Sequence, residues 1–485
     1  MASLEELRKE RLRKLEILKE NRMEPYPSLS SREFSIQKVI DDFDELSKQK
    51  QIIIAGRILA LRGQGALLFL DFYDGTGRLQ GLLKADSNTN NNFELFKKTV
   101  DIGDFIELKG TLFITKRGEK TLQVSEWKML TKSIQPLPDK WRGIIDEETR
   151  YRKRYLDLLL NQELREIFEK KTKFWDVTRS FLKDKGFFEV ETPTLELTTG
   201  GAEAHPFQTY HRDFDIDLYL RISVGELWQK RLMASGFEKT FEIGRVYRNE
   251  GSSPNHLQEF TNMEFYWAYA DYKKGMILAQ ELYQTIAEKV FGTTKFTTGK
   301  YNYDLSGDWA RIDYQEEVLR QTGIDVLTTD IDKIITKLKE LNVVYIGNSR
   351  ERLTDTLWKY CRKNISGPVF LINHPKFISP LAKSIPNNPD YTERFQIIIA
   401  GSENGSGYSE LNDPIEQKKR FEEQRELLLS GDTEAMMPDW DFVEALEHGI
   451  PPTCGFGFGE RLFAFMVDKP VRETQLFPLL KPKGL

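Results

Sequence analysis

The stretch 241–272 combines side chains that could hold a charged, flat ligand. Two runs, 241–248 and 260–270, alternate apolar and polar residues and are joined by a polar segment with Gly251 and Pro254, which predicts an antiparallel hairpin. Because side chains in a strand alternate between two faces, one face of the second run is apolar and suits a core. The other face presents a flat ring, an amide, a carboxylate and a phenol: Phe260, Asn262, Glu264 and Tyr266.

The first run of this hairpin adds charge on a single parity, at Glu242, Arg248 and Glu250. A solvated face would more often carry Lys, Ser and Thr, without a Phe and a Tyr between them. We therefore interpret this face of the hairpin as the floor of a binding site.

The composition limits the class of protein. With 485 residues, 39% hydrophobic and 30% charged, the chain suits a soluble protein of two or three domains. No apolar run reaches the length of a membrane span, and the N-terminus lacks a signal-peptide core. The two cysteines, Cys361 and Cys454, cannot form a disulfide framework, so we expect a protein of the reducing cytoplasm. We expect no membrane partner. The net charge of −5 argues against indiscriminate nucleic-acid coating but permits a local basic surface.

Residues 49–132 are expected to form the first folded domain. Five strand-like runs with a short helical piece after the third predict an OB-fold, a five-stranded β-barrel often used on single-stranded nucleic acid. Phe69, with Arg62 before it and Gln80 after it, could stack on an unpaired base and read its edge. Equally, Phe69 could belong to the core and its neighbours to the surface.

The flanks of this barrel divide the rest of the chain. Residues 1–48 read as a helical segment whose charged helix at 4–22 is solvated or clamps RNA, and 133–150 reads as a proline-punctuated linker. The remainder, 151–485, would be a second domain, with a mostly helical insertion at about 320–365. Three arginines at its start either begin a helix or touch RNA: Arg150, Arg152 and Arg154.

Several segments of the second domain suggest where a ligand could bind. A helix at 163–183 leads to a strand ending at Pro193, and a Gly-Gly turn at 200–201 allows close backbone approach. Apolar strands near 368–383 and 394–414 end in polar, glycine-rich loops. Finally, three glycines precede a helix with Arg461, an arrangement that suits phosphate and that structural turns also use: Gly455, Gly457 and Gly459.

In this order the segments resemble the bacterial-type class II lysyl-tRNA synthetases over nearly the whole chain. The most specific pieces are GGAEAHPF, ELWQKRL, RNEG…EFTNMEFYWAYADY, SPLAK and YSELNDP. The resemblance implies an α+β catalytic domain of antiparallel sheet flanked by helices, behind an anticodon-binding OB domain. It also implies a homodimer formed through the helix–strand–Pro193 unit.

The resemblance further implies a lysine–tRNA ligase. ATP and L-lysine would give lysyl-adenylate and pyrophosphate, with Arg248 and Arg461 as catalytic residues, and the lysyl group would pass to the 3′ end of tRNA(Lys). The implied lysine site is Gly201, Glu226, Arg248, Glu264, Tyr266, Ser406, Tyr408 and Glu410. The implied ATP site is Arg248, Glu250, His256, Phe260, Glu403 and Arg461. The implied Mg²⁺ ligands are Glu403 and Glu410. The implied anticodon site is Arg62, Phe69, Gln80 and Glu119.

The chain departs from the family pattern at a few positions. Gln396 stands where a metal-binding Glu is usual, which leaves the number of Mg²⁺ ions open, and Ser406 replaces a pocket Asn. The glycine run before Arg461 is one residue short and is followed by Glu460 where Asp is commoner. The segment that leads to Glu226, RISVGEL, is one residue longer than in the family. These last differences shift local register by one position and keep the charged groups.

Three other functions compete with this interpretation. An aspartyl- or asparaginyl-tRNA synthetase would share the architecture but would need cations where Glu264, Tyr266 and Glu410 stand. A synthetase-like paralogue acting on a non-tRNA acceptor would usually lack the barrel. A non-catalytic OB-fold RNA-binding protein would not need the ATP-site residues that this chain has.

Overall fold

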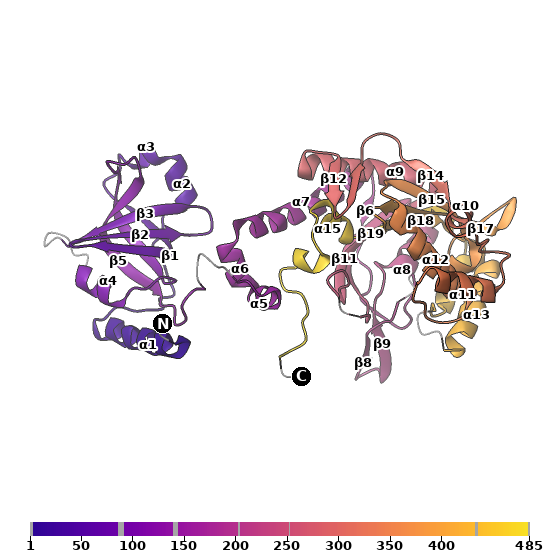
Figure 1. Ribbon diagram of the computed structural model, residues 1–485, viewed down its shortest axis with the longest axis horizontal. Coiled ribbons are helices and arrows are strands. Elements are labelled where there is room, and N and C mark those ends of the chain that lie inside the picture. Colours follow the sequence, from indigo (N-terminus) through magenta and orange to yellow (C-terminus); the bar gives the residue numbers. More distant parts are fainter. Residues whose placement is uncertain are drawn as a thin grey trace. The chain divides into compact units, whose positions relative to one another are not determined.

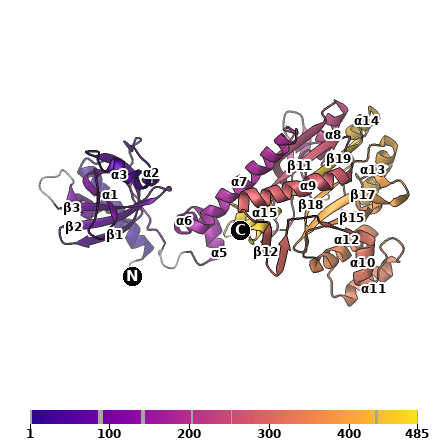
Figure 2. The ribbon, with the colours of Figure 1, turned by 90° about the horizontal axis from the view of Figure 1, so that it is seen from above.

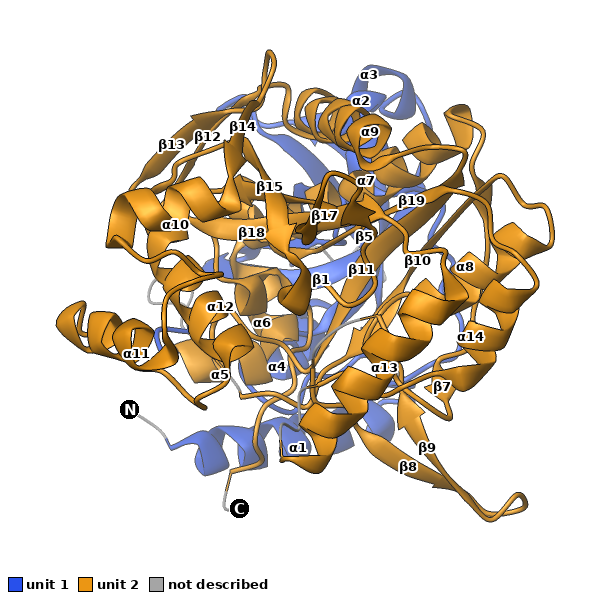
Figure 3. Ribbon diagram, turned by 90° about the vertical axis from the view of Figure 1, so that its right-hand side faces the viewer, with its two compact units in different colours: residues 1–146 blue, residues 147–485 orange. Residues whose placement is uncertain are grey.

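The computed structural model describes residues 3–85, 92–138, 144–201, 204–251, 253–431 and 435–483. The chain forms two compact units, residues 1–146 and 147–485 (Figure 3). Part of the predicted linker (139–143) and two residues of GGAEAHPF (202 and 203) lie outside the described residues. Across the described ranges, no helix combines the length and the apolar composition that crossing a membrane requires.

The first unit contains a closed five-stranded barrel with strand order β1-β2-β3-β5-β4 (Figure 1). The barrel strands are β1 (Ile52–Gln64), β2 (Leu67–Tyr73), β3 (Arg78–Lys84), β4 (Phe105–Ile114) and β5 (Lys120–Thr131). The helix α4 (Phe93–Thr99) follows the third strand. Side chains of β2 alternate, with Leu68, Leu70 and Phe72 buried inside. The predicted OB-fold is confirmed.

The N-terminal helices pack onto this barrel. They are α1 (Leu4–Glu20), α2 (Ile36–Asp41) and α3 (Phe43–Leu46). Leu15 and Leu18 of α1 are buried, and buried Arg11 donates hydrogen bonds to the carbonyls of Ile102, Ser133 and Gln135. The expectation of a solvated helix at 4–22 is therefore wrong for the face of α1 that carries Arg11, because the Arg11 guanidinium binds carbonyls of the barrel unit.

The second unit is built on a large, mainly antiparallel sheet with strand order β14-β15-β17-β18-β19-β11-β10-β6. Only the pairs β14–β15 and β10–β6 along this order are parallel. The sheet strands are β6 (Phe188–Glu189), β10 (Lys239–Tyr247), β11 (Glu259–Ala268), β14 (Ala310–Asp313), β15 (Val369–Pro375), β17 (Asn388–Ile399), β18 (Ser402–Ser409) and β19 (Thr453–Gly459), with β16 (Ser384–Ile385) paired to β17. Smaller sheets contain β7 (Leu195–Glu196), β8 (Gln208–His211) and β9 (Ile216–Leu220), and β12 (Lys295–Thr298) and β13 (Tyr301–Asp304).

Helices cover both faces of the large sheet, as predicted. One face packs against α7 (Gln162–Asp184) and α9 (Tyr272–Ile286), which run side by side (Figure 2). The core between them is aromatic and includes Phe174, Phe265, Tyr283, Phe456 and Phe458. At one end of the opposite face, Tyr266 and Ala268 pack with α8 (Glu226–Ala234), α13 (Pro414–Leu429) and α14 (Trp440–Glu447).

Further helices complete this unit. They are α5 (Glu147–Arg152), α6 (Arg154–Leu160), α10 (Tyr314–Thr322), α11 (Ile331–Glu340), α12 (Arg350–Cys361) and α15 (Arg461–Met466), with short turns at Ala287–Phe291, Arg362–Asn364, Lys376–Ile378 and Val471–Thr474. The helices α10, α11 and α12 share a core of their own on β15 and β17. Segment 301–365 is thus mostly helical, but it begins with the strands β13 and β14.

Two details of the sequence interpretation change. The glycine-rich segments at 402–409 and 455–459 are strands rather than loops, because their backbones approach closely: a Cβ at Gly407 would lie 2.6 Å from the Gly455 carbonyl oxygen. Of the three arginines at the start of the unit, Arg150 and Arg152 lie in the last turn of α5, and Arg154 begins α6. Arg154 is fully buried and pairs with Asp157 and Glu473, so it cannot reach RNA.

Candidate active site

Three neighbouring strands form the floor of the site on the face opposite the aromatic core. Across β18, β19 and β11, Ser406 pairs with Gly457 and Gly457 with Glu264, while Tyr408, Gly455 and Tyr266 form the next row. The middle strand carries glycines in both rows, which leaves space for the neighbouring side chains. A Cβ at Gly457 would lie 2.7 Å from Glu264 Cγ, and one at Gly455 would collide with Glu410 Oε1.

Three carboxylates gather over this floor, and we call Glu226, Glu264 and Glu410 the carboxylate cluster. Their exposed fractions are 5%, 8% and 3%. Glu264 accepts hydrogen bonds from the Val224 amide at 2.8 Å and from the Tyr266 hydroxyl at 3.1 Å. The Tyr408 hydroxyl donates to Glu226. The structure therefore brings together the groups predicted to bind the ammonium groups of lysine.

Burial and mutual repulsion make this cluster difficult to ionise. Burial raises the pKa of Glu264 to about 7, and the charge of Glu226 adds to the effect. Burial raises the pKa of Glu410 to about 8, because the attraction of Lys230 only partly offsets burial and the charges of Glu226 and Glu264. Buried carboxylates of this kind are stabilised by a cation that enters among them.

The sequence analysis missed Lys230, which lies inside the cluster. Its Nζ is 2.7 Å from Glu226 Oε1 and 2.5 Å from Glu410 Oε2. Glu226 and Lys230 are four residues apart on α8, a spacing that brings side chains together on a helix. That spacing within ELWQKRL was the signal that could have identified this ion pair.

Arginines and carboxylates meet beside the cluster, where ATP was predicted. Arg248 follows β10, donates to the Ile222 carbonyl at 3.4 Å, and has its guanidinium 5.3 Å from the centroid of the Phe260 ring. Burial lowers the pKa of Arg248, against the opposing charges of Glu250, Glu264 and Glu403. The Arg248 guanidinium thus lies within the electrostatic reach of both predicted sites.

Arg461 begins α15 and shares these neighbours. Burial lowers the pKa of Arg461, and the positive charges of Arg362 and Arg248 lower it further. The negative charges of Glu403 and Glu250 act in the opposite direction. The predicted ATP residues Arg248, Glu250, Glu403 and Arg461 are therefore close enough to interact. Arg362, whose Nη1 lies 4.0 Å from Glu403 Oε2, was missed because it comes from the turn after α12, far away in the sequence.

His256 lies in the loop between the hairpin strands and is exposed. Its Nδ1 is 2.7 Å from the Ser253 hydroxyl, so its orientation depends on this loop. Glu250 is also exposed, and Phe260 is half-buried. These residues are available to a ligand that lies on the hairpin.

The structure separates the two predicted metal ligands. Glu403 lies near the start of β18, paired with Ile398, whereas Glu410 follows the end of that strand, about 20 Å along an extended chain. Glu410 is also ion-paired with Lys230. Among the described residues, no three His, Cys, Asp or Glu side chains are grouped to hold a metal. The assignment of Glu403 and Glu410 to Mg²⁺ therefore stays a prediction, and in this structure one oxygen of Glu410 is paired with Lys230.

Other predicted residues have clear local partners. Gly201 has φ +86° and lies against Glu226, since a Cβ there would be 2.5 Å from Glu226 Oε2. Ser406 Oγ accepts a hydrogen bond from Arg394 at 3.4 Å. Gln396 is buried, and its Oε1 has no hydrogen-bond partner among the residues described.

Two acidic residues near the site have structural partners. Glu242, on the charged parity of the hairpin, is buried and pairs with Arg221 at 2.6 Å, and it accepts hydrogen bonds from Thr192. It therefore anchors the segment before Pro193 and does not line the binding floor. Glu460, at the uncertain register before Arg461, is buried and pairs with Lys171 at 2.5 Å.

The predicted anticodon residues lie on the barrel unit. Phe69 of β2 pairs with Arg62 of β1, and β2 also pairs with β3, which carries Gln80. Phe69 is half-buried on the outward parity of β2, so it is not part of the barrel interior. Arg62 pairs with Asp71 at 2.9 Å, Gln80 accepts from Thr121, and Glu119 is exposed before β5.

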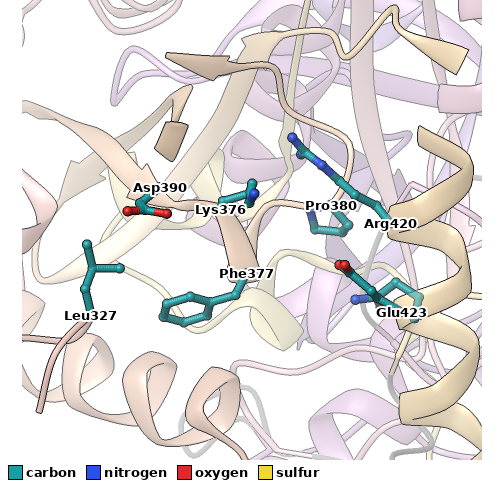
Figure 4. A pocket seen from close by; sticks show the side chains of 8 residues that line it. Leu327, Lys376, Phe377, Pro380, Asp390, Arg420 and Glu423 are labelled. Atoms are coloured by element: carbon teal, nitrogen blue, oxygen red, sulfur yellow. The ribbon is translucent and has the colours of Figure 1, made fainter. Parts of the chain in front are cut away.

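A separate hollow lies between the turn after β15 and α13 (Figure 4). The residues that line it include Lys376, Phe377, Asp390, Arg420 and Glu423. None of the predicted site residues is among its lining residues. Arg420 is committed to structure, because it donates to the carbonyls of Ser379 and Ala382 within SPLAK. The hollow therefore lies beside the loop that precedes Lys383 and is not part of the carboxylate cluster.

Comparison with known proteins places this geometry in a family. Residues 146–481 match the family model of tRNA synthetases class II (D, K and N), and residues 52–130 match that of the OB-fold nucleic acid binding domain. The chain therefore belongs to the class II tRNA synthetases. Within that class its place is with the lysine–tRNA ligases.

Curated lysine–tRNA ligases match almost end to end. That of Thermotoga maritima is 42% identical over 487 residues, covering 99% of this chain and 97% of the relative. That of Moorella thermoacetica is 42% identical over 478 residues (98% and 97%), and that of Thermosipho africanus 40% over 486 residues (99% and 97%). The predicted enzyme class and lysine–tRNA ligase function are confirmed, and the aspartyl or asparaginyl alternative is not favoured.

Proposed function

We propose that the carboxylate cluster binds L-lysine, which this chain activates with ATP and transfers to the 3′ end of tRNA(Lys). The observation that carries this proposal is the gathering of three buried carboxylates beside Arg248. Lysine presents one carboxylate and two ammonium groups. A guanidinium next to buried carboxylates complements that distribution of charge.

The geometry suggests how lysine would lie. Glu226 and the backbone at Gly201 would take the α-ammonium, since they lie against each other. Glu264, Tyr266 and Glu410 would take the ε-ammonium. Tyr408 would wall the aliphatic stem, with Ser406 in the neighbouring row of the floor. Amino acids without a second ammonium would leave buried carboxylates unpaired, which costs several kcal/mol or so and provides specificity.

ATP would lie on the hairpin beside this site. Phe260 and Arg461 would sandwich the adenine, Glu250 would contact its amino edge, and His256 would bind the terminal phosphates. Glu403, with Glu410 as the second predicted ligand, would hold Mg²⁺, and the neutral Gln396 would leave the rest of the coordination to water and phosphate oxygens. When bound, Mg²⁺ would offset the charge of the phosphates.

The chemistry would then be an in-line displacement. A lysine carboxylate oxygen bonds to the α-phosphorus as the bond to the pyrophosphate oxygen breaks, which gives lysyl-adenylate and pyrophosphate. Arg248 would hold the carboxylate and an α-phosphate oxygen together, since its fork of donors suits both. Arg461 would orient the nucleotide. Alignment and charge stabilisation account for catalysis, without a covalent enzyme intermediate.

Pyrophosphate exchange across the standard amino acids tests the substrate assignment. We expect lysine to support exchange at least ~100-fold better than aspartate or asparagine, because the cluster is anionic. A preference for either of those amino acids would refute the lysine assignment.

Truncating Phe69 should weaken charging of tRNA without affecting adenylate formation. Losing one base stack costs about 1–3 kcal/mol, so kcat/KM for tRNA(Lys) should fall roughly 5- to 150-fold in Phe69→Ala. Aminoacylation and lysine-dependent pyrophosphate exchange measure the two steps separately. Ile114→Ala, at an exposed position on β4, is the matched control. An equal loss of both activities would contradict a role for Phe69 on the anticodon.

Apolar side chains support the proposed homodimer. Around the helix–strand–Pro193 unit, Phe188, Leu195 and Leu197 are 60%, 48% and 62% exposed. Large apolar residues gathered in this way suit a surface that a second copy covers. We place the enzyme in the cytoplasm, where the substrates proposed for it are used.

A further inference from the structure

Lys230 occupies a site built for an ammonium group. Its side chain is 3% exposed, and its Nζ contacts one oxygen of Glu226 and one of Glu410. Although burial opposes ionisation, these two carboxylates raise the pKa of Lys230, so it is a cation. Three rings surround the Nζ at 5.2–5.8 Å from their centroids, as in sites that bind cations on aromatic faces: Tyr266, Tyr408 and Phe442.

The resident ammonium leaves other oxygens of the cluster for a ligand. Glu410 Oε1 is buried and has no hydrogen-bond partner among the described residues. Glu226 Oε2 faces Gly201, on the side away from the oxygen that contacts Lys230. Lys230 therefore fixes two of the three carboxylates through one oxygen each and does not fill the site.

The formal charges of the site match lysine only when Lys230 is counted. Once a cationic ligand keeps all three carboxylates ionised, they face two resident cations, Lys230 and Arg248, which leaves one negative charge. Lysine carries one net positive charge and would neutralise it. Without Lys230, the buried cluster would keep an uncompensated negative charge even with lysine bound, and such a charge is costly in a buried site.

We infer that Lys230 is a specificity-determining positioning residue that orients Glu226 and Glu410 and sets the charge of the site to match lysine. This inference rests on the proposed function, because it assumes that the cluster binds substrate lysine. The role differs from that of an ordinary structural ion pair, since it predicts an effect on lysine that an added ammonium should restore.

The test uses the full-length chain and begins with the wild-type enzyme. Lysine-dependent pyrophosphate exchange by the wild type must be present; its absence would refute the proposed function itself. In Lys230→Met, which keeps an unbranched side chain up to Cε and removes the ammonium group, KM for lysine should rise roughly 30-fold or more. KM for ATP should stay within about threefold of the wild type. Lys274→Met, an exposed lysine that also lies over an aromatic ring, is the matched control.

Chemical rescue distinguishes positioning from structure. In Lys230→Ala, n-propylammonium should lower KM for lysine, whereas n-propanol should not, and neither should lower it in the wild type. An unchanged or lower KM for lysine in Lys230→Met would overturn the inference. So would equal losses for lysine and ATP with no rescue by the amine, since that pattern marks a structural ion pair.

Discussion

Arg248→Ala is expected to abolish lysyl-adenylate formation, with kcat/KM in pyrophosphate exchange falling by about 10³-fold or more. The Arg248 guanidinium is partly buried, stacks over Phe260, and lies within reach of both Glu264 and Glu403. It is thus placed between the proposed lysine and ATP sites. Its removal would take away the group that joins the attacking carboxylate to the α-phosphate, and it would remove one cation from beside Glu264 and Glu403.

The control for this variant is Arg245→Ala, at an exposed arginine on β10, the strand that Arg248 follows. We expect exchange by this control to remain within a fewfold of the wild type. Melting temperatures of both variants would exclude a general loss of folding. If Arg248→Ala retained near-normal exchange, the assignment of this arginine to the reacting groups would be refuted.

The hairpin shows why much of the site could be predicted from the sequence. Its strands alternate strictly, so the parity of Phe260, Glu264 and Tyr266 already placed them on one face. The barrel was predictable for the same reason, since its five runs have clear apolar alternation and turns between them. Local periodicity determines which side chains share a face, and in these segments tertiary packing does not override it.

Other features depend on contacts that no local pattern reveals. The segments at 402–409 and 455–459 have many glycines and read as loops, but close packing of three strands requires those glycines within the sheet. The separation of Glu403 from Glu410 follows from β18 being a strand. Arg362 reaches Glu403 from an insertion whose docking the sequence does not indicate. Such arrangements are properties of the assembled sheet.

The lysine side of the site should respond most strongly to Glu264→Gln. This change keeps the shape of the side chain and removes its charge, so the ε-ammonium would lose a buried partner. Loss of such a partner costs about 2–5 kcal/mol, and KM for lysine should rise ~30-fold or more while KM for ATP changes little. Initial rates of pyrophosphate exchange with varied lysine measure this effect. Glu259→Gln, an exposed position on the same strand, is the control.

The pH dependence separates the charge of Glu264 from its shape. Burial raises the pKa of Glu264 to about 7, and its surroundings are Glu226, Arg248, the Tyr266 hydroxyl and the Val224 amide. Only the ionised carboxylate can pair with an ammonium, so below pH 7 a proton must leave before lysine binds. Wild-type KM for lysine should therefore fall as the pH rises from 6 to 8, and Glu264→Gln should lose the part of this slope centred near pH 7. An identical slope in both proteins would show that the titrating group lies elsewhere, because an amide has no proton to release in that range.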